Sequence, residues 1–177
     1  RLGRRIKPHS MKNLLFLCLL PGFVFSAFAQ KTQPKWTEAD RQYLLDGLKT
    51  SQSEVIKAVE PLNEKQLHFK PDSSQWSVAE VLEHVGVYEE LLYWDLLNNQ
   101  YTEERPDLVD SVAGKDAVMV AYATDPAKGQ APFAAQPLGR FTNKAELLNF
   151  FNRSRNEVIK MVQETDVDFR LHFIYRP

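Results

Sequence analysis

The residues of this 177-residue sequence best suited to metal binding or nucleophilic chemistry are four histidines and one cysteine. His84 lies in the segment "WSVAEVLEHV" (residues 76–85), where apolar residues recur at helical spacing. A neutral imidazole on a rigid helix is the commonest protein ligand for a metal ion. The structural alternative is a core histidine whose nitrogens meet a backbone carbonyl or a carboxylate. The residues alone leave both interpretations open.

The other histidines offer no second ligand for His84. His68 lies between two prolines and is predicted to be a surface residue, and His172, in "FRLHF", is predicted to be a loop residue at the bundle end. The sequence contains no HxxxH, HExxH or CxxC, no phosphate-binding glycine loop and no Gly-x-Ser-x-Gly elbow. A metal site needs two or three further ligands within about 2.0–2.2 Å of the ion. The sequence around His84 supplies one ligand.

Residues 11–29, "MKNLLFLCLLPGFVFSAFA", have the plan of a secretory signal peptide. A lysine beside Met11 precedes an apolar run, and the segment closes on Ala27-Phe28-Ala29, which predicts cleavage after Ala29. The run is too short for stable membrane insertion. We therefore expect residues 1–29 to be an upstream extension plus signal peptide, residues 30–177 to be the folded domain, and the protein to be secreted or periplasmic.

The charge of the expected mature chain limits its partners. Removing residues 1–29 removes five of the 22 Lys and Arg residues and none of the 23 acidic residues, which leaves a net charge of −6. That charge argues against nucleic acid or an anionic membrane as the partner. The only cysteine, Cys18, lies in the predicted signal peptide, so the mature chain has no disulfide and no thiol nucleophile.

Three long helical patterns predict an all-α, up-down helical bundle. The first opens at Thr37 and ends at Pro61, the second opens with the capping box Ser77-Val78-Ala79-Glu80 and runs to about Asn99, and the third follows Thr142 or Asn143. The connection over residues 100–141 is long enough to be a crossover, and it has a short helical pattern near residues 115–122.

The apolar side chains predict which face of the second helix is buried. Trp76, just before this helix, is expected to plug the core. The stripe expected to face the core comprises Val78, Val81, Val85, Tyr88, Leu92 and Leu96.

At "WSVAEVLEHV" the chain resembles the DinB-like family of four-helix-bundle metalloproteins. The segment "DPAKGQAPFAAQPLGRFTNKAELLNFFNRSRNEVIKMVQETDVDFRLHF" (residues 125–173) resembles the crossover and third helix of secreted members of that family. The likeness extends over most of the expected mature chain. It combines the Trp-Ser helix start, the internal histidine, the proline-bearing crossover and the third helix in that order.

The resemblance implies a metal site. In that family the histidine matching His84 is one of three ligands to a divalent metal, often nickel or zinc, and the other two come from an HxxxH on a fourth helix. Characterised relatives include transferases that join low-molecular-weight thiols to electrophiles. The sequence as given reaches Pro177 without that motif. We therefore expect a bundle without its fourth helix, an incomplete metal site and no activity in the chain as written.

These observations support two classes of function. The first is an exported, divalent-metal-dependent hydrolase or thiol transferase acting on a small molecule, with His84 as a metal ligand once the full-length chain supplies the missing HxxxH. The alternative is a non-catalytic helical module for binding or assembly, a homodimer included, or a truncated remnant. Whether the protein is an enzyme depends on the missing ligands.

Overall fold

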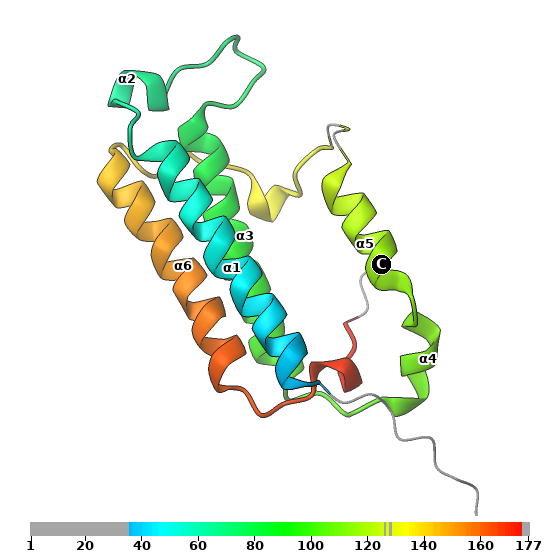
Figure 1. The fold of residues 1–177 in the computed structure, drawn as a ribbon. Helices are drawn as coiled ribbons and strands as arrows, with labels where there is room; N and C mark the ends of the chain where they lie inside the picture. Colours follow the sequence, from blue (N-terminus) through cyan, green and yellow to red (C-terminus); the bar gives the residue numbers. More distant parts are fainter. Residues whose placement is uncertain (1–35, 126, 128, 175–177) are drawn as a thin grey trace, which may run out of the picture. The chain divides into compact units, whose positions relative to one another are not determined.

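Three long helices pack side by side in the computed structural model, which describes residues 36–125, 127 and 129–174. They are α1 (Glu38–Val59), α3 (Val78–Asn99) and α6 (Lys144–Glu164), and α6 packs against both α3 and α1 (Figure 1). The described residues contain no strand. The predicted all-α bundle is therefore confirmed. The predicted signal peptide, its cleavage site and the boundary after residue 29 lie outside the described residues.

Shorter helical elements connect the three long helices. The short helix predicted near residues 115–122 is confirmed and runs two residues further, to Thr124. In chain order the connecting elements are α2 (Glu64–Leu67), η1 (Pro106–Leu108), α4 (Val109–Val112), α5 (Lys115–Thr124), η2 (Phe133–Ala135) and, after α6, η3 (Phe169–Leu171).

Side-chain caps fix where the long helices begin. Thr37 forms a capping box with Asp40 at the start of α1, and Ser77 forms the predicted one with Glu80 at the start of α3. The Asn143 side chain accepts a hydrogen bond from the Glu146 N–H at 2.9 Å, which begins α6. Each cap satisfies backbone donors that have no partner within the helix. The three predicted helix starts are therefore confirmed.

The largest core cluster joins all three long helices at one end of the bundle. Its most deeply buried side chains are Leu67, Leu147 and Phe151. Leu67 comes from the four-residue helix α2, which has its own capping box between Asn63 and Gln66. The remaining buried members of the cluster are Val59, Ala79 and Leu82.

The predicted buried face of α3 is wrong in part. Val78, Val81 and Leu92 are 40%, 47% and 45% exposed, whereas Val85 and Tyr88 are half-buried and pack against core clusters. Because α3 is apolar on two sides, its sequence does not reveal which side meets α6. The side chains that α3 buries are those of Ala79, Leu82, Glu83, Val87, Glu89 and Asn99, together with Gly86.

Gly86 decides which face of α3 packs against α6. An ideal Cβ built on Gly86 lies 2.5 Å from Cε1 of Phe150 and 2.8 Å from its Cδ1, so the Phe150 ring occupies the space that a side chain would take. A glycine inside a helix costs roughly 0.5–1 kcal/mol relative to alanine. At this position glycine lets α3 and α6 approach each other where a residue with a side chain would clash with Phe150.

A buried ion pair joins all three long helices. Nη2 of Arg155 on α6 lies 2.5 Å from Oε1 of Glu89 on α3, and both side chains are about nine-tenths buried. The other terminal nitrogen of Arg155 donates to the carbonyl of Leu48 at 2.8 Å and to the hydroxyl of Ser51 at 2.7 Å, both on α1. Loss of either charged partner leaves the other buried without its counter-charge.

We predict that Gly86→Ala destabilises the bundle by about 1–3 kcal/mol, the usual cost of overpacking a core. The matched control is Gly47→Ala, which lies inside α1 with no atom within 4 Å of the added Cβ. That change should raise stability by up to about 1 kcal/mol. Urea unfolding measures both variants, and equal stabilities would contradict the close approach of α3 and α6.

We predict that Glu89→Ala costs about 3–5 kcal/mol because it leaves the Arg155 guanidinium buried and unpaired. The neighbouring Glu90→Ala is the control, since Glu90 lies 3.8 Å from the exposed Arg153 side chain. Exposed pairs contribute roughly 0–1 kcal/mol. Thermal or urea unfolding measures the loss of stability in both variants. Similar losses would show that the buried ion pair contributes no more to stability than the exposed one.

Candidate metal-binding site

His84 lies half-buried on α3, between two aromatic rings. Its ring centroid is 5.0 Å from that of Trp76 and 4.9 Å from that of Tyr88, which meets it edge-on at 83°. Trp76 is 39% exposed, so the prediction that it plugs the core is wrong. Its ring instead packs against that of His84, although Trp76 precedes the histidine by eight residues. The aromatic neighbours limit how the imidazole can rotate.

A backbone carbonyl fixes the protonation of one His84 nitrogen. Nδ1 lies 2.5 Å from the carbonyl oxygen of Ala135, in the crossover element η2. A carbonyl oxygen can only accept a hydrogen bond, so Nδ1 carries the proton and donates it. In the neutral ring the lone pair is then on Nε2. This is the arrangement in which metal-binding histidines are usually held, with the second nitrogen donating to a carbonyl or carboxylate.

The Ala135 residue is itself held firmly. It is fully buried against Val87 of α3 and Phe150 of α6, and its N–H donates to the carbonyl of Pro132 at 2.9 Å. Phe150 also stacks on Phe141 with ring centroids 4.8 Å apart. The crossover is therefore anchored to both helices at the point where it meets His84.

The residue before His84 binds the same crossover segment. The Glu83 carboxylate accepts hydrogen bonds from the N–H of Leu138 at 3.1 Å, the N–H of Gly139 at 3.0 Å and Nε of Arg140 at 2.8 Å. Burial raises the pKa of the Glu83 carboxyl, but these donors outweigh it and hold that pKa below its ordinary value. Glu83 is thus a buried carboxylate that the fold keeps ionised.

His84 is not part of a complete metal-binding group among residues 36–125, 127 and 129–174. Within those ranges, no group of three or more His, Cys, Asp or Glu side chains converges on one point. His68 is exposed and lies 3.7 Å from a carboxylate oxygen of Glu64, which confirms its prediction as a surface residue. His172 occupies the predicted loop position, with Nδ1 at 3.1 Å from the Thr102 hydroxyl.

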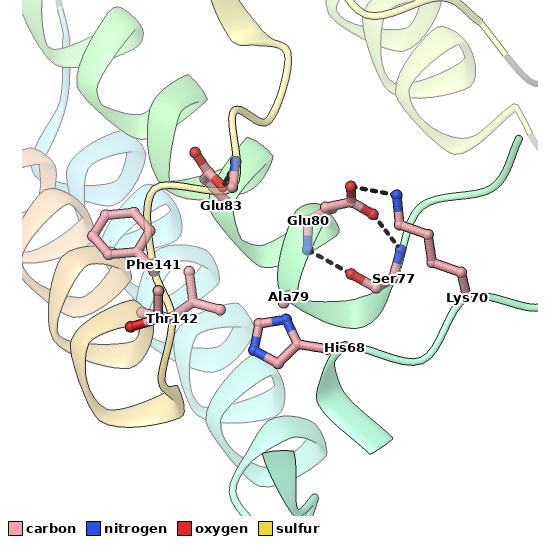
Figure 2. A pocket seen from close by; sticks show the side chains of 10 residues that line it. His68, Lys70, Ser77, Ala79, Glu80, Glu83, Phe141 and Thr142 are labelled. Atoms are coloured by element: carbon pink, nitrogen blue, oxygen red, sulfur yellow. Dashed lines mark hydrogen bonds and ion pairs between the residues drawn. The ribbon is translucent and has the colours of Figure 1, made fainter. Parts of the chain in front are cut away.

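A separate hollow of about 420 Å³ lies at the start of α3, where Figure 2 shows His68, Lys70, Glu80 and Thr142 around it. Nζ of Lys70 is 2.6 Å from Oε1 of Glu80, whose other oxygen accepts from the N–H of Ser77 at 2.8 Å. Burial raises the pKa of Glu80, but these partners hold it below its ordinary value. His84 does not line this hollow. Within the described residues, the side chains that line this hollow do not form a group that could hold a metal ion.

The fold and the site together define a helical-bundle protein in which a half-buried histidine on α3 is held by a crossover carbonyl. A family-wide sequence comparison matches residues 48–177 to the DinB superfamily, and the chain belongs to that superfamily. The resemblance seen in the sequence is therefore confirmed. No curated protein and no solved structure matches the chain significantly. Within the described residues, no helix is both long and apolar enough to cross a membrane.

The sequence predicts His84 as a candidate metal ligand but does not indicate the residues that orient its ring. Ala135 contributes only its backbone carbonyl, so no side-chain pattern could reveal its role. Glu83 was interpretable only as a polar residue on a helix, since its partners lie 55 to 57 positions further along the chain. The one available signal was the presence of a carboxylate on the side of α3 that turned out to be buried.

The lowered pKa of Glu83 predicts how stability depends on pH. A carboxyl whose pKa is lower in the folded state stabilises fully above its unfolded pKa of about 4.3, and that contribution is lost as pH falls through the folded value. Glu83→Gln should therefore be less stable than the unmodified protein at neutral pH, and the difference should shrink on acidification. Urea unfolding at neutral and acidic pH measures this, with exposed Glu146→Gln as the control. A constant difference would contradict the assignment.

Proposed function

We propose that this DinB-superfamily protein binds a divalent metal ion through Nε2 of His84 and that the bound ion supports a reaction on a small molecule. The observation that carries the proposal is the hydrogen bond from Nδ1 of His84 to the Ala135 carbonyl, which leaves Nε2 as the lone-pair nitrogen. Membership supports it too, because the superfamily is generally metal-associated. His84 alone makes an incomplete site. The proposal therefore requires further ligands from outside the described residues, and the resemblance names an HxxxH pair.

The residues present fit a metal ligand of this kind. The Ala135 carbonyl holds the proton on Nδ1, and the Trp76 and Tyr88 rings limit rotation of the imidazole. The metal, nickel or zinc by resemblance, would supply a lowered pKa for a bound water or thiol and would polarise the electrophile. The protein's share is to present one neutral nitrogen in a fixed direction from a rigid helix, which lowers the entropy lost when the ion binds.

Two reaction classes follow from this chemistry, hydrolysis and thiol transfer. We propose export on the strength of the signal-peptide pattern in residues 11–29. Low-molecular-weight thiols are mostly intracellular, so hydrolysis stands beside thiol transfer for an exported protein. Assays of the metal-loaded protein with and without an added low-molecular-weight thiol separate the two.

A non-catalytic binding or assembly module is the second candidate. The observation that favours it is the apolar face of α3 opposite its buried residues, with Val78, Val81 and Leu92 exposed. Contiguous exposed apolar residues often mark an interaction surface. This candidate predicts self-association or partner binding that does not depend on His84, so His84→Ala would leave it unchanged.

We predict that full-length protein expressed from its complete gene binds one nickel or zinc ion and that His84→Ala weakens the binding by more than about 100-fold. Loss of an outer-shell partner alone costs roughly 10–100-fold, and loss of a ligand should cost more. Equilibrium dialysis with metal analysis measures the stoichiometry and the affinity. His68→Ala, which changes an exposed histidine, is the matched control and should bind normally. Equal binding by His84→Ala would remove His84 from the site.

A further inference from the structure

We propose that Glu83 is a positioning residue for His84. By anchoring the crossover segment 135–140 to α3, it keeps the Ala135 carbonyl against Nδ1 and so keeps Nε2 as the lone-pair nitrogen. The functional part of this inference rests on the proposed metal-ligand role of His84. The geometric part concerns the imidazole alone and can be tested without metal.

Two consecutive residues of α3 bind one short stretch of the crossover. Nδ1 of His84 donates to the Ala135 carbonyl, and three residues further on the Glu83 carboxylate accepts from Leu138 and Gly139. The Glu83 side chain is only 3% exposed, so water cannot replace these bonds easily. Hydrogen bonds to a buried charge are about twice as strong as those between neutral groups. Glu83 is therefore the strongest polar anchor of this segment.

The backbone of the crossover is shaped to meet this carboxylate. Gly139 has φ of 68°, in the left-handed region that glycine adopts without strain. The N–H groups of Leu138 and Gly139 reach different oxygens of Glu83, Oε1 and Oε2, and Nε of Arg140 adds a third donor. A turn that offers three donors to one carboxylate fits only a charged acceptor at position 83.

The remaining contacts of Ala135 do not replace this anchor. Val87 and Phe150 hold the methyl group, and Pro132 accepts the hydrogen bond from the N–H. The peptide unit of the Ala135 carbonyl has one further bond, a long one of 3.3 Å from the Gln136 N–H to the Phe133 carbonyl. Beyond Gln136 the chain runs within two residues into the segment that Glu83 binds, so we infer that Glu83 holds the direction of this carbonyl. Which imidazole nitrogen carries the proton is set by the hydrogen bond that the other one makes. Without the carbonyl, a neutral imidazole in water favours the proton on Nε2, and that proton must move to Nδ1 before Nε2 can bind a metal.

The test is the tautomer of His84, measured by ¹⁵N NMR of the ring nitrogens in metal-free protein at about pH 8, well above the ordinary histidine pKa of about 6.5. The unmodified protein should show a protonated Nδ1 and an unprotonated Nε2. Glu83→Leu should shift the ring toward protonation at Nε2. Arg140→Gln, which removes one of the three donors from a guanidinium that is 43% exposed, should fold in any case and shift the ring part of the way.

The matched control is Glu89→Gln, which also changes a buried, arginine-paired carboxylate on α3 but does not contact segment 135–140. It should lose stability and keep the Nδ1–H tautomer, so the readout separates positioning from simple destabilisation. An unchanged tautomer in Arg140→Gln and in folded Glu83→Leu would overturn the proposal. So would an equal shift in Glu89→Gln.

The positioning role and the metal role can fail separately. In full-length protein, Glu83→Leu should weaken nickel or zinc binding by about 10–100-fold, as loss of an outer-shell partner does. A tautomer shift in a protein whose metal binding does not depend on His84 would overturn the proposed function and leave the positioning role intact. Metal binding that depends on His84 but is unaffected by Glu83→Leu would overturn the positioning role alone.

Discussion

The close approach of α3 and α6 at Gly86 and Phe150 is the constraint on which the site depends. The Phe150 ring fills the space above Gly86, and the same ring packs against Ala135 and stacks on Phe141. The Arg140 guanidinium lies 5.4 Å from the centre of that ring. One aromatic side chain therefore joins the helix pair to the crossover. Packing between the helices brings Ala135 beside His84, and the hydrogen bonds of Glu83 hold the chain that follows it.

Two buried carboxylates on α3 then hold the neighbouring segments in place. Glu83 and Glu89 both lie on the buried side of α3, and each meets an arginine. Glu89 meets Arg155, which also bonds to α1, and so fixes the bundle. Glu83 meets Arg140 and two backbone N–H groups, and so fixes the crossover. Buried carboxylates persist only when such partners compensate for the lost hydration, so each marks a place where the fold requires one particular arrangement.

The sequence predicts the parts of this structure that depend on near neighbours. Thr37, Ser77 and Asn143 cap helices through residues three positions away, so their roles could be inferred from spacing alone. The buried face of α3 could not be inferred from spacing, because both sides of this helix carry apolar residues. Which side packs against α6 depends on the contact of Gly86 with the Phe150 ring, 64 positions further along the chain. The same holds for the partners of His84 and Glu83, since a backbone carbonyl or N–H has no sequence signature.

The most direct test of the metal role of His84 is the crystal structure of full-length protein grown with nickel or zinc, with anomalous scattering recorded at the absorption edge of the metal. The account predicts an anomalous peak about 2.0–2.2 Å from Nε2 of His84, with Nδ1 still bonded to the Ala135 carbonyl. A peak bound to Nδ1, a peak at His68 or His172 with none at His84, or no peak at all would contradict it.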